Sequence, residues 1–293
     1  MCRALRSGIW VLLYLAMLAG CTAGVPLEDL KNFREAFLEA QKAGDLVYDE
    51  IAPILSKESG HAEACTTDRS GTPKCFDPDQ VIGNATRSNE DPSLRARRLA
   101  LALLSEYSLA LVELSDGRSQ QELTRSIQET AELATALTAL AGAAAPAGLP
   151  ALLTQPIIAS FTDLAVRLDR VRTAETVRAA LIANQDTIAR LIDQLIADTR
   201  PIYAIYYRNQ TIRVLESPAA ATASEMAKAA KYHEALTAYV VILRQMKASN
   251  ARLARLASAA PGSAGELRAV VEEATRIKLS AETFWSAIRE VRK

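Results

Sequence analysis

The 293-residue chain contains few of the residues that interrupt helices or favour sheets. It has only 12 glycines and 11 prolines, and aromatic residues make up 5% of it. Glycine and proline are the poorest helix formers, while aromatic and β-branched residues favour strands. Alanine, the best helix former, supplies 54 residues. This composition predicts an all-α protein and excludes a collagen-like chain or a small disulfide-dense domain.

An excess of charge of either sign is also absent. The chain has 34 lysines and arginines against 34 aspartates and glutamates. Proteins that bind nucleic acids usually carry a basic excess, because they neutralise phosphates. We therefore expect no nucleic-acid partner.

Motifs that carry chemistry are lacking as well. There is no glycine-rich phosphate loop, no HExxH, no GxSxG and no CxxC. The only histidines, His61 and His233, are far apart in the sequence. Carboxylates alternate with arginine and lysine along the helical segments, which is typical of a solvated face with ion pairs. We predict a protein that is not an enzyme, with no catalytic residues and no cofactor.

The first 21 residues have the layout of an export signal. A positive start at Arg3 and Arg6 precedes an uncharged apolar run over residues 9–18. This run is about ten residues long, whereas a membrane-spanning helix needs about 20. A short apolar run after basic residues is typical of a secretory signal peptide.

The end of this segment, Leu18-Ala19-Gly20-Cys21, resembles the lipobox of bacterial lipoproteins. The resemblance covers residues 1–21 only. It implies that residues 1–20 are removed and that Cys21 is acylated and becomes the first mature residue. The alternative is an ordinary signal peptide that is cleaved elsewhere.

The lipoprotein resemblance also implies a location. Two or three acyl chains anchor a protein firmly, at about 0.8 kcal/mol per buried methylene. In proteobacterial lipoproteins an aspartate after the cysteine favours retention in the inner membrane, and this chain has Thr22 there. We expect a lipoprotein of the bacterial cell envelope, anchored in the outer membrane and facing the periplasm. Its expected partners are the membrane, through the lipid, and an unidentified envelope protein.

Two cysteines remain in the body of the chain, Cys65 and Cys75. Thiols in an exported chain meet an oxidising compartment, so we predict a disulfide between them. The alternative is a metal site that also uses His61 and Asp68 or Asp77. Zinc sites usually show tighter Cys-x₂₋₄-Cys pairs, and we therefore expect no metal.

The predicted organisation has four parts: a signal peptide (1–20), a lipid-anchored N-terminus with a first helix (21–57), a disulfide-containing loop (58–92) and a helical bundle (93–293). The loop contains several glycines and prolines and shows no helical period, so it is interpreted as a tied-down surface loop or a loop that contacts a partner. An N-cap at Asp91 ahead of Pro92 and three capping boxes divide the bundle into helices. The capping boxes are Ser119 with Glu122, Thr222 with Glu225, and Ser263 with Glu266. The expected helices cover about 93–115, 119–145, 149–172, 174–216, 222–259 and 263–291.

Two of these helices show apolar residues at alternating spacings of three and four. This spacing predicts coiled-coil-like seams between long helices. With the first helix, we expect an elongated bundle of about six or seven long helices. The two rows are Leu181, Gln185, Ile188, Ile192, Leu195, Thr199, Ile202 and Tyr206, and Tyr232, Leu236, Tyr239, Leu243, Met246, Asn250, Leu253 and Ala257.

Residues 133–162 carry no charged side chain. Prolines and a glycine near the middle indicate two helix ends that meet at a turn, which is either buried against the bundle or exposed as an apolar tip. An exposed tip would be similar, in architecture only, to the hydrophobic hairpins of helical pore-forming toxins. The residues of the candidate tip are Leu140, Leu149, Leu152, Leu153, Ile157 and Ile158.

One basic cluster, Arg95, Arg97 and Arg98, lies near a helix start. It is interpreted as surface charge, or alternatively as a contact with anionic envelope material. For the whole protein we predict a non-enzymatic envelope lipoprotein that acts as a scaffold or protein-interaction module. One alternative is a helical lipoprotein that binds a lipid or another apolar ligand. The other is a membrane-perturbing protein that uses the 133–162 hairpin.

Overall fold

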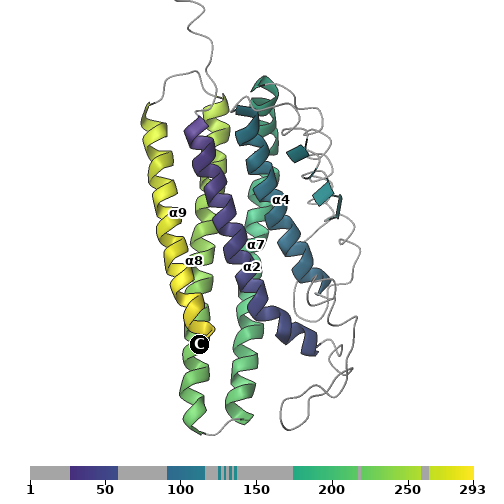
Figure 1. Ribbon diagram of the computed structural model, residues 1–293, viewed down its shortest axis with the longest axis vertical. Helices are drawn as coiled ribbons and strands as arrows, with labels where there is room; N and C mark the ends of the chain where they lie inside the picture. Colours follow the sequence, from purple (N-terminus) through teal and green to yellow (C-terminus); the bar gives the residue numbers. More distant parts are fainter. Residues whose placement is uncertain are drawn as a thin grey trace, which may run out of the picture.

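The computed structural model describes residues 27–58, 91–115, 174–216, 219–258 and 264–293, together with single positions between 125 and 136. Within these ranges all the elements are α-helices and none is a strand (Figure 1), which confirms the predicted all-α class. The predicted helices over 119–145 and 149–172 lie outside the described residues, apart from those single positions. The five helices are α2 (Leu27–Glu58), α4 (Pro92–Ser115), α7 (Ala174–Glu216), α8 (Ala219–Ser258) and α9 (Ala264–Val291).

Local sequence signals determine where several helices begin. The side chain of Asp91 accepts a hydrogen bond from the backbone nitrogen of Ser93 at 2.7 Å, and its carbonyl accepts one from Arg95 at 3.0 Å. This is the N-cap predicted ahead of Pro92. The capping box predicted at Thr222 is wrong, because α8 already begins at Ala219. The Glu225 carboxylate instead lies 4.0 Å from Arg213 and 3.8 Å from Lys228.

The helices lie roughly side by side along one axis (Figure 1). The two longest, α7 and α8, form an antiparallel hairpin; at a rise of 1.5 Å per residue, their 43 and 40 residues extend about 65 and 60 Å. Helix α2 contacts all four other helices. It runs in the same direction as α9, since Trp285 bonds to Glu39 and Arg292 to Glu50.

Gly44 allows α2, α4 and α8 to approach closely. A Cβ atom at this position would collide with Cδ1 of Leu101 and lie 2.9 Å from the Tyr239 hydroxyl. Both neighbours are buried, so neither side chain can move away into solvent. Helix α2 continues through both Gly44 and Pro53. Figure 1 shows that its final turns, which contain Pro53, lean away from the bundle axis.

The apolar rows predicted for 174–216 and 222–259 lie mainly in the core. Their buried members are Ile188, Ile192, Leu195, Ile202 and Tyr206 on α7, and Tyr232, Leu236, Tyr239, Leu243, Met246 and Asn250 on α8. The helical period of these rows therefore indicates correctly which faces of the two helices point inward.

Two arginines that we had interpreted as surface charge, or as contacts for anionic envelope material, lie inside the bundle. Arg97 of α4 and Asp198 of α7 form an ion pair at 3.0 Å, with both side chains 0% exposed. Arg98 bonds to Asp45 at 2.7 Å and to Asp49 at 2.8 Å on α2. Both interpretations are therefore wrong for Arg97 and Arg98, because these side chains join α4 to its neighbours. Desolvation raises the pKa of Asp198 despite the opposing effect of Arg97.

Four tyrosines from three helices meet in the core. The hydroxyls of Tyr48 and Tyr239 lie 3.5 Å apart, and the Tyr232 hydroxyl donates to the Val47 carbonyl at 3.0 Å. The rings of Tyr206 and Tyr232 stack with centroids 4.0 Å apart. Burial raises the pKa of Tyr48 and of Tyr206 to about 12, and it also raises those of Tyr232 and Tyr239. The phenols are therefore neutral near pH 7.

Candidate functional site

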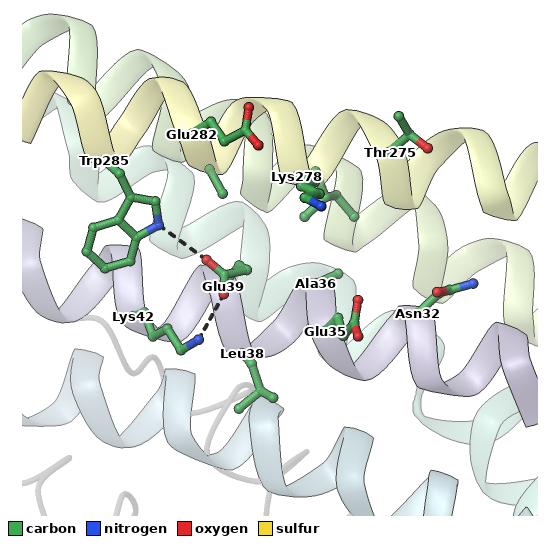
Figure 2. Close-up of a pocket in the computed structure, with 12 residues that line it drawn as sticks. Asn32, Glu35, Ala36, Leu38, Glu39, Lys42, Thr275, Lys278, Glu282 and Trp285 are labelled. Atoms are coloured by element: carbon green, nitrogen blue, oxygen red, sulfur yellow. Dashed lines mark hydrogen bonds and ion pairs between the residues drawn. The ribbon is translucent and has the colours of Figure 1, made fainter.

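The parallel helices α2 and α9 form the walls of an open groove of about 630 Å³ (Figure 2). Buried Ala36, Ile277 and Ala281 contribute apolar surface to it, and their small or compact side chains leave room between the helices. The other lining residues are Asn32, Glu35, Leu38, Glu39 and Lys42 of α2, and Thr275, Lys278, Glu282 and Trp285 of α9.

A small polar network closes one end of this groove. The Trp285 indole donates to one Glu39 oxygen at 3.3 Å, and Lys42 donates to the other at 2.9 Å (Figure 2). The Trp285 ring also packs edge-on against Phe284, with centroids 5.8 Å apart. Glu39 therefore already has partners and holds the indole in place.

Besides Glu39 and its partner Lys42, three more charged groups lie along the groove. Glu35 stands on α2, and Lys278 and Glu282 stand on α9 (Figure 2). Within the described ranges, none of the three makes a hydrogen bond or an ion pair with another side chain. The groove therefore combines an apolar floor with two carboxylates and one ammonium group that have solvent as their partner.

A second candidate surface lies at the far end of the α7–α8 hairpin. Helix α9 ends at Val291, where Glu290 lies within electrostatic range of Lys231 on α8. Beyond this level α7 and α8 continue without α9 (Figure 1). We call residues 207–216 and 219–230 the hairpin tip.

The hairpin tip exposes large apolar side chains. Tyr207 is 43% exposed, Ile212 45% and Leu215 81%. At 100° per residue these positions fall within an arc of about 140° on α7. Exposed Arg208 and Thr211 lie on the same arc, so the tip presents a mixed apolar and polar surface that the described helices leave uncovered. Exposed apolar side chains gathered in this way are typical of a surface that contacts another molecule.

His233 lies beside the hairpin tip, and its ring contacts Tyr203 with centroids 5.1 Å apart. The side chain is exposed on the flank of α8.

The other site residues predicted from the sequence lie outside the described residues. These are Cys21, Cys65, Cys75, Leu140, Leu149, Leu152, Leu153, Ile157 and Ile158. From the uncharged stretch the structure describes Leu133, which packs partly buried against the core, and Thr135 and Ala136, which are exposed.

No group of three or more potential metal ligands occurs among the described residues. In the same part of the chain, no helix combines the length and the apolar character needed to span a bilayer. Comparison with protein-family models, curated proteins and solved structures finds no match to this chain. The groove and the hairpin tip are therefore interpreted from their own chemistry.

Sequence reasoning missed both surfaces, for different reasons. The groove depends on the pairing of α2 with α9, which are more than 200 residues apart in the sequence. No local pattern reports such a pairing. For the hairpin tip a signal exists: Ile212 and Leu215 lie within one turn of the helix end at Ser217-Pro218. Apolar residues so close to a helix end can extend past the packed core.

Proposed function

We propose that this protein is a non-enzymatic lipoprotein of the bacterial cell envelope, anchored through Cys21 and acting as a scaffold or protein-interaction module. The supporting observation is the hairpin tip, which exposes Leu215 at the end of the bundle opposite the start of α2 (Figure 1). One end of the protein would then be anchored in the membrane, and the other end would bind a partner protein.

The dimensions of the chain support this arrangement. Residues 22–26 separate Cys21 from α2, and five residues reach at most about 17 Å. The start of α2 would therefore stay close to the lipid surface. Helix α7 extends about 65 Å, so a bundle standing on this anchor would carry the hairpin tip well into the periplasm. We infer the outer membrane as the site of anchoring, from Thr22.

The finer fold belongs to the same proposal. We infer six or seven helices in the whole chain, with coiled-coil-like packing between α7 and α8. A disulfide between Cys65 and Cys75 would tie down the 58–92 loop. The apolar hairpin over 133–162 would complete the bundle, which the packing of Leu133 on the core supports.

The groove between α2 and α9 favours a second candidate function, the binding of a lipid or another partly apolar ligand. Its volume of about 630 Å³ lies within the range of roughly 300–1,000 Å³ that is usual for small-molecule sites. The groove is partly open, so a ligand would lie in it with part of its surface facing solvent.

Anchoring is tested by changing Cys21 to serine. The Cys21→Ser protein is expected to lose acylation and, once the apolar run over residues 9–18 has been removed with the signal peptide, to leave the membrane pellet after a carbonate wash, because no acyl chains remain to bury. Fractionation and the intact mass of the purified protein measure both effects. A Cys21→Ser protein that stays in the pellet would contradict the lipid anchor.

The hairpin tip is tested by changing Leu215 to glutamate. Because Leu215 is 81% exposed, the variant is expected to melt within about 2 °C of the parent, as surface substitutions rarely exceed 0.5 kcal/mol. A photo-crosslinker at exposed Thr211 should lose its envelope protein adduct in this variant. Leu279→Glu is the matched control, since Leu279 is 58% exposed on α9 and away from the tip. An adduct that survives Leu215→Glu would argue against the tip.

A further inference from the structure

We propose that the groove between α2 and α9 binds one molecule of an aminophospholipid, a lipid with a phosphoethanolamine headgroup. The ammonium group of the lipid pairs with a carboxylate of the groove, Glu35 or Glu282, its phosphate pairs with Lys278, and part of one acyl chain lies on the apolar floor (Figure 2). The placement of this end of the bundle beside a membrane rests on the proposed function. The chemistry of the groove is independent of that proposed function.

The charges of the groove select a zwitterionic ligand. Glu35, Glu282 and Lys278 are the charged groups here that have no side-chain partner among the described residues. Together they present two negative charges and one positive charge. A purely anionic headgroup would satisfy Lys278 but would be repelled by both carboxylates. An ethanolamine ammonium donates up to three hydrogen bonds to carboxylate oxygens, whereas a choline group has no N–H to donate.

The floor of the groove selects a ligand with an apolar part. Ala36, Ile277 and Ala281 expose no polar side-chain atom to it, and Leu38 and the Trp285 indole add apolar surface. A free phosphoethanolamine would leave this surface in contact with water. An acyl chain covers it, and the methylene stem of Lys278 can pack along the chain while its ammonium reaches the phosphate.

The position of the groove fits a lipid ligand. Its α2 wall begins at Asn32, only five residues, or about 7.5 Å of helix, after α2 starts at Leu27. With Cys21 in a membrane and a tether of at most about 17 Å, this part of α2 lies within reach of the headgroup layer.

Trp285 provides a direct reporter. The sequence contains two tryptophans, at positions 10 and 285. A Trp10→Phe variant of the full chain therefore reports the groove alone, whether or not residues 1–20 are removed. The protein is purified in maltoside micelles and titrated with the single-chain lipids lysophosphatidylethanolamine, lysophosphatidylcholine and lysophosphatidylglycerol while Trp285 emission is recorded.

We expect the emission of Trp285 to shift to shorter wavelength and to saturate as the ethanolamine lipid is added. The lipid mole fraction that gives half of the full shift should be at least fivefold lower for the ethanolamine lipid than for the glycerol lipid or the choline lipid. The double variant Glu35→Gln/Glu282→Gln should reduce this preference to less than twofold. Glu272→Gln is the matched control, because Glu272 is exposed on α9 but does not line the groove. It should keep the full preference.

Three results would overturn the proposal. The first is an equal shift of Trp285 emission with all three lipids, which would show that the apolar chains bind without any selection of the headgroup. The second is a preference that survives Glu35→Gln/Glu282→Gln. The third is binding of free phosphoethanolamine as tight as that of the lipid, which would point to a soluble ligand and leave the apolar floor without a role. The intact mass of the same sample shows whether Cys21 is acylated, so failure of the anchor is recognised separately.

Discussion

Changing Asp198 to alanine is expected to lower the free energy of unfolding by about 3–5 kcal/mol, the usual cost of leaving one member of a buried ion pair without its partner. Arg97 and Asp198 are both 0% exposed, so water cannot replace the lost carboxylate. Arg97 keeps a hydrogen bond of 2.9 Å to the Ser93 carbonyl, which does not neutralise its charge. Urea unfolding followed by circular dichroism measures the change.

Asp193 on the same helix provides the matched control. It pairs with Lys247 at 2.6 Å, but the two side chains are 54% and 38% exposed. Exposed pairs contribute about 0–1 kcal/mol, so Asp193→Ala should have little effect. The double variant Arg97→Met/Asp198→Leu removes both charges and should recover most of the loss. If Asp198→Ala and Asp193→Ala cost the same, the Arg97–Asp198 pair is not buried as described.

Raising the pH from 9 to 11 is expected to remove about 3 kcal/mol of stability through Tyr48 and Tyr206 alone. Burial raises the pKa of each to about 12 in the folded chain, whereas an unfolded tyrosine has a pKa near 10. Between these values the unfolded chain loses phenolic protons that the folded chain keeps. The stabilisation is therefore complete below pH 10 and is lost as the pH rises towards 12, by roughly 1–2 kcal/mol for each tyrosine at pH 11.

The measurement is urea unfolding at pH 9, 10 and 11. Tyr48→Phe should reduce the pH dependence, because phenylalanine has no proton to lose. Tyr207→Phe is the control for removing a tyrosine hydroxyl that is exposed in the folded chain, since Tyr207 is 43% exposed. A Tyr48→Phe protein with the parent's full pH dependence would show that the Tyr48 phenol does not contribute.

Other buried phenols add to the alkaline effect. Burial also raises the pKa of Tyr107, Tyr232 and Tyr239. These groups add to the loss of stability expected from Tyr48 and Tyr206, and unfolding should become steeply dependent on pH above 10.

Local sequence patterns predict most of the helical structure. The Asp91-Pro92 pair indicates the start of α4, and Ser217-Pro218 indicates the end of α7, because a cap and a proline act on backbone groups within one or two turns. The rows of apolar residues on α7 and α8 identify the buried faces for a similar reason, since a helix places residues three and four apart on one side. At Thr222 the local rule fails, because α8 continues back through the alanines to Ala219.

The same helical spacing could also predict that an arginine and an aspartate are buried. Arg97 lies between Leu94 and Leu101 at helical spacing, and Asp198 lies between Leu195 and Ile202. A charge inside each apolar row indicates that two opposite charges face the core. Which charge meets which depends on how α4 packs on α7, and the spacing within one helix contains no information about its neighbour.

The sequence by itself therefore determines that this chain is helical, where most of its described helices begin and end, and which faces of α7 and α8 are buried. These properties arise from residues a few positions apart, and local backbone and side-chain interactions decide them. Only the tertiary structure decides that α2 contacts all the other described helices, that Arg97 meets Asp198, and that Trp285, Glu35 and Lys278 line one groove. These arrangements join residues about 50 to 250 positions apart, and shape complementarity between whole helix faces selects them.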